Sequence, residues 1–112
     1  MEKIAFNDLE AQYRCLKKEI DAQIAEVLEN AHFISGPQVK ELEKALCAYT
    51  GRKYCLATSS GTAALLIPLM AKGIGAGDAV FVPAFTFFAS AEVVSLVGAT
   101  PVFCDCEEDT FA

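Results

Sequence analysis

The alternation of apolar and polar residues predicts two helices in the first half of the chain. Over residues 9–28 the apolar positions recur at three- and four-residue steps, which is typical of an amphipathic helix. Asn7 or Asp8 is placed to cap the start of this helix. A second, shorter helix follows, because Pro37 suits a first helical turn and Gly51 suits a helix stop. We therefore expect a helical arm at the N-terminal side of the chain.

From Lys53 onward the apolar pattern changes to short runs that are typical of buried strands. The strand candidates are residues 54–58, 79–82 and 101–105. Between them lie two helical segments, one from near Thr62 toward Lys72 and one from near Thr86 to Gly98. The order β-α-β-α-β predicts an α/β fold with helices packed on a sheet.

Composition places the chain among packed, acidic proteins. Apolar residues make up 54 % of it, and the formal net charge is -6. No basic stripe of the kind that binds nucleic acid is present, because lysines such as Lys17 and Lys18 alternate with acids. The first residues lack the apolar core of a signal peptide, and no apolar run suits a membrane span. We expect a soluble, cytoplasmic protein.

Five cysteines form an odd set that suits reduced thiols in a cytoplasm. Cys104 and Cys106 are the one closely spaced pair. A zinc site would need wider spacing and two more ligands, and His32 is the single histidine. We therefore expect no metal site, with the thiols in the core or at strand ends.

The segment with the clearest chemistry is a strand that leads through Ser59, Ser60 and Gly61 into a helix at Thr62. The free N–H groups of a first helical turn and the helix dipole attract an anion, and Gly61 allows a phosphate to approach closely. The hydroxyls of Ser60 and Thr62 could also donate. The alternative is an ordinary helix cap, in which one of these hydroxyls only satisfies the helix itself.

Two other features of the sequence each allow more than one interpretation. The glycines of residues 73–77 follow a helix and precede a strand, so they predict a helix stop and a tight turn rather than a phosphate loop. Phe85, Phe87 and Phe88 follow a strand at the edge where α/β sheets bind ligands. They could stack on a planar cofactor or belong to the core.

Five short segments, in this order, carry a resemblance to a known family. They are residues 33–39 (FISGPQV), 60–65 (SGTAAL), 73–78 (GIGAGD), 82–87 (VPAFTF) and 98–103 (GATPVF). Together they cover essentially the whole chain and resemble the opening of the DegT/StrS family of sugar aminotransferases. The resemblance implies the N-terminal portion of a fold-type-I large domain, incomplete over residues 1–112. Residues 1–51 would form the helical arm, and residues 52–112 the start of the cofactor-binding sheet.

The resemblance also implies roles for four residues. Gly61, Thr62 and Ala63 match the segment that holds the phosphate of pyridoxal 5'-phosphate, and Phe87 matches the aromatic residue that stacks on the pyridine ring. It implies a homodimer that moves an amino group from a donor such as glutamate to a nucleotide-linked keto sugar. A sugar dehydratase of the same family, an inert fragment and a small phosphate-binding module are the alternatives.

The family's Schiff-base lysine lies beyond position 112, so the resemblance implies that this chain holds no catalytic residue and is inactive alone. It also implies that strands from later in the chain separate residues 54–58 from the other two strands. That arrangement would leave an apolar edge exposed. We therefore expect a partial gene product. The sugar and the aminated carbon are not determined by these residues.

Overall fold

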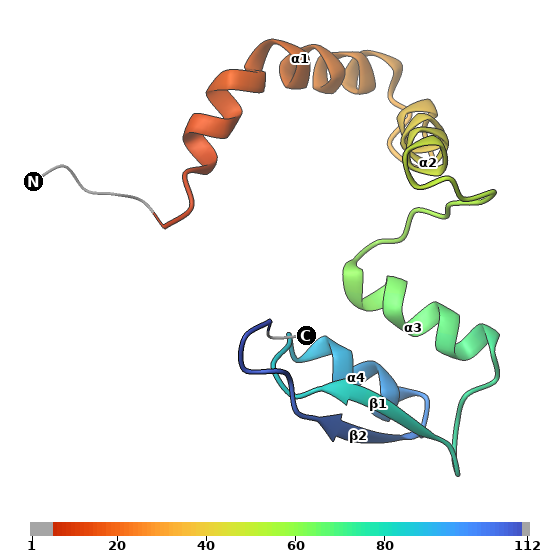
Figure 1. The fold of residues 1–112 in the computed structure, drawn as a ribbon. Helices are drawn as coiled ribbons and strands as arrows, with labels where there is room; N and C mark the ends of the chain where they lie inside the picture. The colour runs from red at the N-terminus through yellow and green to blue at the C-terminus, as the bar shows by residue number, and fades with distance from the viewer. Residues whose placement is uncertain (1–5, 111–112) are drawn as a thin grey trace, which may run out of the picture. The chain divides into compact units, whose positions relative to one another are not determined.

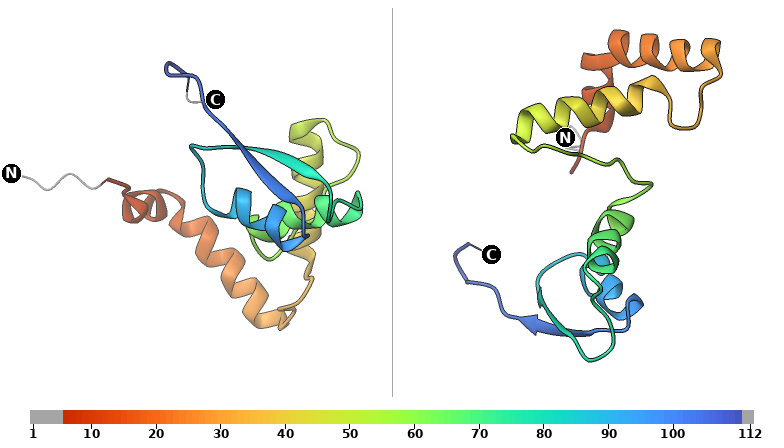
Figure 2. Two further views of the ribbon diagram at one scale, coloured as in Figure 1. Left: turned by 90° about the horizontal axis from the view of Figure 1, so that it is seen from below. Right: turned by 90° about the vertical axis from the view of Figure 1, so that its right-hand side faces the viewer.

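The structure is a computed structural model that describes residues 6–110. The chain divides into two compact units, Met1–Cys55 and Leu56–Ala112, which are described separately below (Figures 1 and 2). Within the described part of the chain, no helix combines the length and the apolar character that crossing a membrane requires.

The first unit contains two helices, α1 (Leu9–Asn30) and α2 (Pro37–Thr50). Asp8 caps α1, because its carboxylate accepts a hydrogen bond from the backbone N–H of Ala11 at 2.8 Å. Gly51 ends α2 in the left-handed conformation, with φ of 67°. Both predicted helices and their end signals are confirmed.

A glycine is required where the chain enters α2. Gly36 is buried, and a Cβ atom built on it would lie 2.7 Å from the backbone oxygen of His32. Because that oxygen belongs to the main chain, it cannot move aside as a flexible side chain would. Even alanine at position 36 would force the turn between α1 and α2 to shift.

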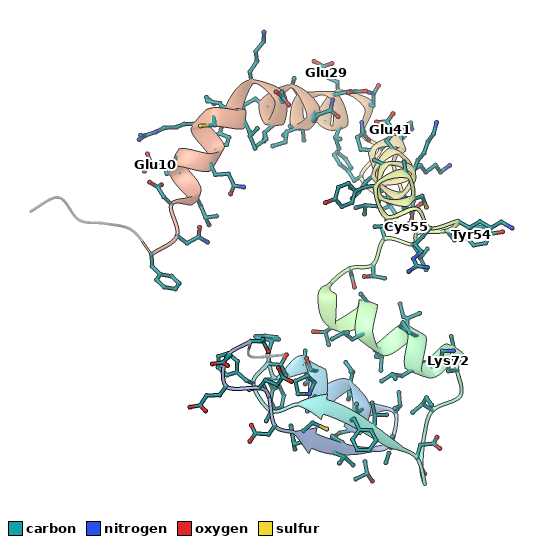
Figure 3. All side chains as sticks on the ribbon, in the orientation of Figure 1. Glu10, Glu29, Glu41, Tyr54, Cys55 and Lys72 are labelled. Atoms are coloured by element: carbon teal, nitrogen blue, oxygen red, sulfur yellow. The ribbon has the colours of Figure 1, made fainter. Side chains whose placement is uncertain are left out.

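The outer face of α1 carries ordinary solvated charges. Lys17 donates hydrogen bonds to Asp21 and to the hydroxyl of Tyr13, and all three residues are exposed. The hydrogen bond from Lys17 holds the pKa of the Asp21 carboxyl below its usual value. Figure 3 shows Glu10 and Glu29 on the same helix with their carboxylates extending away from it. This pattern agrees with the absence of a basic patch in the sequence.

The second unit is a small α/β structure. Its elements are α3 (Gly61–Ala71), β1 (Ala79–Pro83), α4 (Ala89–Leu96) and β2 (Thr100–Cys104). The two strands pair in parallel, with Ala79 opposite Thr100 and Pro83 opposite Cys104. Helix α4 connects them and packs on both strands, and α3 packs on α4. The predicted α/β class is confirmed, and the last two strand candidates are neighbours.

Two predicted elements differ from the structure. Residues 54–58 form no strand, and the sheet of the described chain contains β1 and β2 alone. A strand exists only through hydrogen bonds to a neighbour, and an apolar run cannot supply that neighbour itself. Helix α4 begins at Ala89 rather than near Thr86, so Phe87 lies in the connection that precedes it.

The glycine-rich segment between α3 and β1 is a helix stop followed by a tight turn. Gly73 has φ of 70° directly after α3, and Gly77 has φ of 94°. Asp78 closes the turn: its carboxylate accepts from Gly75 N–H at 2.9 Å, and its own N–H donates to the Gly75 oxygen at 3.0 Å. The predicted helix stop and tight turn are confirmed.

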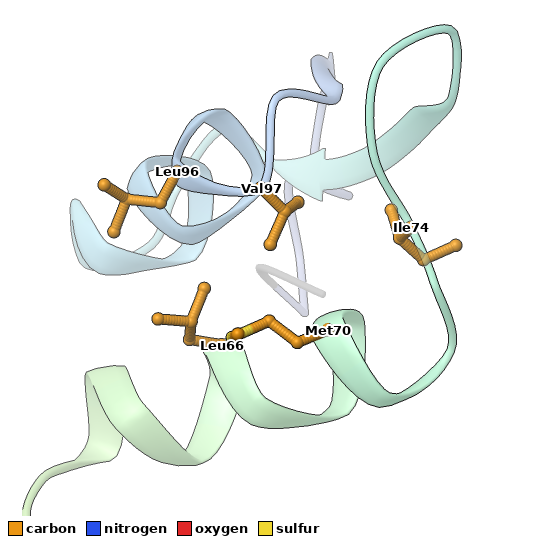
Figure 4. A pocket seen from close by; sticks show the side chains of 5 residues that line it. All are labelled: Leu66, Met70, Ile74, Leu96 and Val97. Carbon is orange, nitrogen blue, oxygen red and sulfur yellow. The ribbon is translucent and has the colours of Figure 1, made fainter.

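The core of the second unit is small and lies between α4 and the strands. Its buried members are Val82, Ala89, Val93, Val94 and Ala99. Beside it, α3 and α4 leave an apolar groove of about 530 Å³ (Figure 4). The groove is lined by Leu66, Met70, Ile74, Leu96 and Val97. The packing of the two helices is therefore incomplete.

Large apolar side chains remain exposed in both units. They include Leu9, Leu28 and Tyr49 in the first unit, and Met70 and Phe81 in the second. Complete burial of a large apolar side chain is worth roughly 1.5–3 kcal/mol, and these side chains, which are 62% to 89% exposed, forgo much of it. The isolated chain therefore has little to offset the entropy cost of ordering its backbone.

We predict that the isolated 112-residue chain is aggregated or loosely folded, because five buried core residues cannot offset so much exposed apolar surface. Size-exclusion chromatography should show a broad or early peak, and circular dichroism should show melting without a sharp transition. A single monomeric peak with a cooperative melt would contradict this prediction.

Candidate functional site

The parallel pairing of the strands and the packing of α3 on α4 place the candidate residues on one side of the second unit. The carboxyl ends of β1 and β2 lie at the same edge, and α4 begins there because it follows β1. Helix α3 ends where the turn into β1 begins, so its start lies at the opposite end, beside the carboxyl edge (Figure 1). The start of α3 and the segment that contains Phe87 thus share the edge at which α/β sheets bind ligands.

Ser60 is the residue that caps α3. Its backbone is extended, with φ of -162° and ψ of 164°, and its hydroxyl oxygen accepts from the N–H of Ala63 at 3.1 Å. Its carbonyl oxygen accepts the first helical hydrogen bond, from the N–H of Ala64 at 3.0 Å. The cap predicted as an alternative to phosphate binding is therefore present, and Ser60 rather than Thr62 provides it.

The cap leaves several donors at the helix start unused. Among the residues that the structure describes, neither the N–H of Gly61 nor that of Thr62 has a hydrogen-bond partner. The same holds for the hydroxyl of Thr62, which is half-buried. Ala63 differs, because its N–H is already bound to Ser60. Two amides and one hydroxyl are thus available to an anion.

The space over Gly61 is open. A Cβ atom built on Gly61 would meet nothing within 4 Å, and its φ is not in the left-handed range. Neither packing nor backbone conformation therefore explains a glycine here. A group that approaches the amides closely from outside the described chain would explain it, and a phosphate at a helix start is such a group.

The charge distribution also favours an anion at α3 rather than at α4. Helix α3 contains no charged residue, so no charge of its own opposes the helix dipole at its start. Helix α4 has Glu92 in its first turn and no side-chain cap. A carboxylate there would repel a phosphate. Gly61 and Thr62, with the small Ala63 behind them, fit a phosphate group.

Phe87 lies in the connection between β1 and α4, with 78 % of its surface exposed. Its backbone oxygen accepts from the N–H of Ser90 at 3.0 Å, and the hydroxyls of Thr86 and Ser90 lie 3.2 Å apart. These bonds order the backbone around Phe87 while leaving its ring uncovered. Within the described chain the ring is not part of the core, so a planar ligand could stack on it.

Lys72 is the one lysine among residues 56–112. It lies at the C-terminal end of α3 (Figure 3), eleven positions after Gly61, which places it about 16 Å from the helix start. The unit that carries the candidate phosphate site therefore has no amine within reach of a group bound there.

Cys104 and Cys106 form neither a disulfide nor part of a metal-ligand cluster within the described residues. Cys104 ends β2 and is exposed, Cys106 is half-buried, and all five cysteines are free. Within residues 6–110, no three His, Cys, Asp or Glu side chains gather as metal ligands would.

Thr58 is a feature of the site that the sequence patterns did not single out. Its hydroxyl donates to the backbone oxygen of Ser60 at 3.0 Å. The signal that could have revealed it is the tendency of Ser and Thr to bond to nearby backbone in turns.

Comparison with known proteins identifies similar sequences and structures. Residues 14–112 match the DegT/DnrJ/EryC1/StrS aminotransferase family. The chain is 46% identical, over 108 residues, to UDP-2-acetamido-2-deoxy-3-oxo-D-glucuronate aminotransferase of Pseudomonas aeruginosa, covering 96% of this chain and 30% of that protein. It is 48% identical to a DegT DnrJ EryC1 StrS aminotransferase of Brucella abortus. The TM-score with that structure is 0.94, and the match covers 97% of this chain and 29% of that one.

A structure with a cofactor is also similar. NtdA of Bacillus subtilis with bound cofactor PMP is 40% identical, with a TM-score of 0.72, over 77% of this chain and 20% of that one. The chain therefore spans less than a third of the length of the proteins it matches.

The hydrogen bonds at the start of α3 predict different roles for its two hydroxyls. In the complete protein without cofactor, Ser60→Ala should lower the free energy of unfolding by about 1 kcal/mol, because it removes the cap. Thr62→Ala should change it by less than about 0.5 kcal/mol, because that hydroxyl bonds to no described residue. Urea denaturation of both variants measures this. Equal losses would show that Thr62 also supports the helix.

Proposed function

The chain belongs to the DegT/DnrJ/EryC1/StrS aminotransferase family, and from this premise we propose that the complete protein transfers an amino group to the keto group of a nucleotide-linked sugar. The amino donor is an amino acid such as glutamate. The 46% identity to an aminotransferase named for a UDP-linked 3-oxo sugar supports this substrate class. The 112 residues form the first part of the large domain, with residues 1–51 as a helical arm and residues 52–112 as the start of the sheet.

The observation that carries the proposal is the unused set of donors at the start of α3. The cofactor is pyridoxal 5'-phosphate, and PMP in the similar NtdA structure is its amino form. When bound, this cofactor supplies the aldehyde that takes the amino group from the donor and later passes it to the sugar. The chain's own part is to hold that cofactor in place.

Each of the four candidate residues has a part in holding it. The N–H groups of Gly61 and Thr62 and the Thr62 hydroxyl donate to the phosphate, and the helix dipole adds attraction for its negative charge. Ala63 binds inward to Ser60 and keeps the first turn closed. The exposed ring of Phe87 covers one face of the pyridine ring.

The amine that bonds to the cofactor comes from elsewhere in the complete protein. Lys72 lies at the far end of α3 from the phosphate donors. Residues 56–112 thus supply binding and orientation, and no nucleophile for the covalent step. By this proposal the chain alone is inactive.

The complete protein is a cytoplasmic homodimer in this proposal. The free cysteines suit a reducing compartment. The exposed apolar side chains of α1 and α2, such as Leu28, Leu42 and Tyr49, are the kind of surface that a partner subunit or the rest of the large domain covers.

The activity is tested by incubating the complete protein and cofactor with glutamate and a panel of nucleotide-linked keto sugars. We expect 2-oxoglutarate to form beyond one equivalent per bound cofactor only when a suitable keto sugar is present, since the cofactor can accept one amino group and must pass it on before it accepts another. Mass spectrometry of the sugar product measures the gain of the amino group, and reactions without sugar serve as the control. If no keto sugar supports turnover of glutamate or another amino acid, the proposed function is wrong.

The proposed cofactor contacts predict losses of affinity that differ in size. Thr62→Ala removes a charge-assisted hydrogen bond and should weaken binding of pyridoxal 5'-phosphate about ten- to a hundredfold. Gly61→Ala adds a methyl group where the phosphate approaches and should weaken it by at least about tenfold, without loss of stability. Phe87→Ala removes a stacking face and should cost about two- to tenfold. Absorbance titration of the apo protein measures all three.

Thr50→Ala is the matched control, because the Thr50 hydroxyl bonds to the Leu46 oxygen within α2 and has no part in the proposed site. Its affinity for the cofactor should equal that of the unmodified protein. Unchanged affinity in the Gly61, Thr62 and Phe87 variants would remove this chain's residues from the cofactor site.

A further inference from the structure

Three hydrogen bonds converge on Ser60, the residue before the proposed phosphate donors. Its carbonyl oxygen accepts from the Thr58 hydroxyl at 3.0 Å and from the Ala64 N–H at 3.0 Å. Its hydroxyl oxygen accepts from the Ala63 N–H at 3.1 Å. Ser60 is thus fixed through both its backbone and its side chain.

Two of these bonds belong to any capped helix, but the bond from Thr58 does not. A helix start has the bond from Ala64 as its first backbone hydrogen bond, and a serine cap commonly accepts from the N–H three residues later. The Thr58 hydroxyl is an additional donor from the segment that leads into the turn. It joins that segment to the helix across Ser59.

The direction of the Ser60 carbonyl matters to an anion bound at this helix start. A carbonyl oxygen carries partial negative charge, and one that turned toward a phosphate would repel it. The two donors on this oxygen hydrogen-bond to its lone pairs and hold the carbonyl so that it points away from the free amides of Gly61 and Thr62. They also hold Ser60 in the extended conformation from which those amides follow.

We propose that Thr58 is a positioning residue for the phosphate site, acting through Ser60 rather than by touching the cofactor. This inference rests on the proposed function, because it assumes that the cofactor's phosphate binds at Gly61 and Thr62. Its side chain is half-buried, and its hydroxyl proton is used in the bond to Ser60. Losing the hydroxyl loosens the site without removing any phosphate contact.

The test is a set of substitutions at Thr58 in the complete apo protein. Thr58→Val keeps the shape and removes the hydroxyl, whereas Thr58→Ser keeps the hydroxyl. Dissociation constants are measured by absorbance titration with pyridoxal 5'-phosphate and, separately, with pyridoxal, which lacks the phosphate. We expect Thr58→Val to weaken pyridoxal 5'-phosphate binding about two- to tenfold and to leave pyridoxal binding unchanged. Thr58→Ser should restore native affinity.

The comparison of the two ligands separates positioning from a general loss of structure. Equal weakening of both ligands, native affinity in Thr58→Val, or failure of Thr58→Ser to restore binding would each overturn the inference. If Thr58→Val does not fold, Thr58→Ala compared with Thr58→Ser gives the same test.

Thr62→Ala in the same titration distinguishes this inference from the proposed function beneath it. If Thr62→Ala weakens binding and Thr58→Val does not, the phosphate site stands and the role of Thr58 is wrong. If Thr62→Ala and Gly61→Ala both bind the cofactor as tightly as the native protein, the phosphate lies elsewhere and both inferences fail.

Discussion

The parallel pairing of β1 with β2 is the constraint on which the rest of the second unit depends. Parallel strands cannot be joined by a tight turn, so the chain must cross back over the sheet, and α4 makes that crossing. The crossing buries Val93 and Val94 against the strands and places the start of α4 at their carboxyl edge. It also supplies the helix on which α3 packs. The candidate site lies where these requirements coincide.

At that edge the polar groups divide into two sets. Ser60 and Ala63 bond inward and complete the helix cap, while no residue of the described chain bonds to the donors of Gly61 and Thr62. The capping and phosphate-binding interpretations of this turn are therefore compatible, because they use different atoms. The cap orders these donors without a ligand, so binding of a phosphate as proposed would not have to supply that ordering free energy.

Local signals in the sequence were the most reliable guides to this structure. Gly51 and the glycines of residues 73–77 mark element ends through bonds to residues close by in sequence, and they were placed correctly. The cap of α1 was predicted as Asn7 or Asp8, and Asp8 provides it. Residues 54–58 failed as a strand because pairing depends on a distant partner. The start of α4 was placed three residues too early because Thr86 and the aromatics after it fit a helix turn as well as a connection.

Part of the candidate site could also be predicted from the sequence. The family resemblance pointed to Gly61, Thr62, Ala63 and Phe87, whose roles remain proposals. The sequence could not distinguish Ser60 from Thr62 as the cap, because both hydroxyls lie within a turn of the helix start. The extended backbone of Ser60 and the hydrogen bond that its hydroxyl accepts from Ala63 distinguish it from Thr62.

Two glycines of this chain have different surroundings, and so they should diverge differently over evolutionary time. A side chain at Gly36 would collide with the main-chain oxygen of His32, whereas the space over Gly61 is open. If Gly61 admits the cofactor's phosphate as proposed, a lineage that lost the cofactor but kept the fold would still need Gly36 but would no longer need Gly61. A sequence that keeps Gly36 but has replaced Gly61 would then indicate a relative that still folds but no longer binds the cofactor.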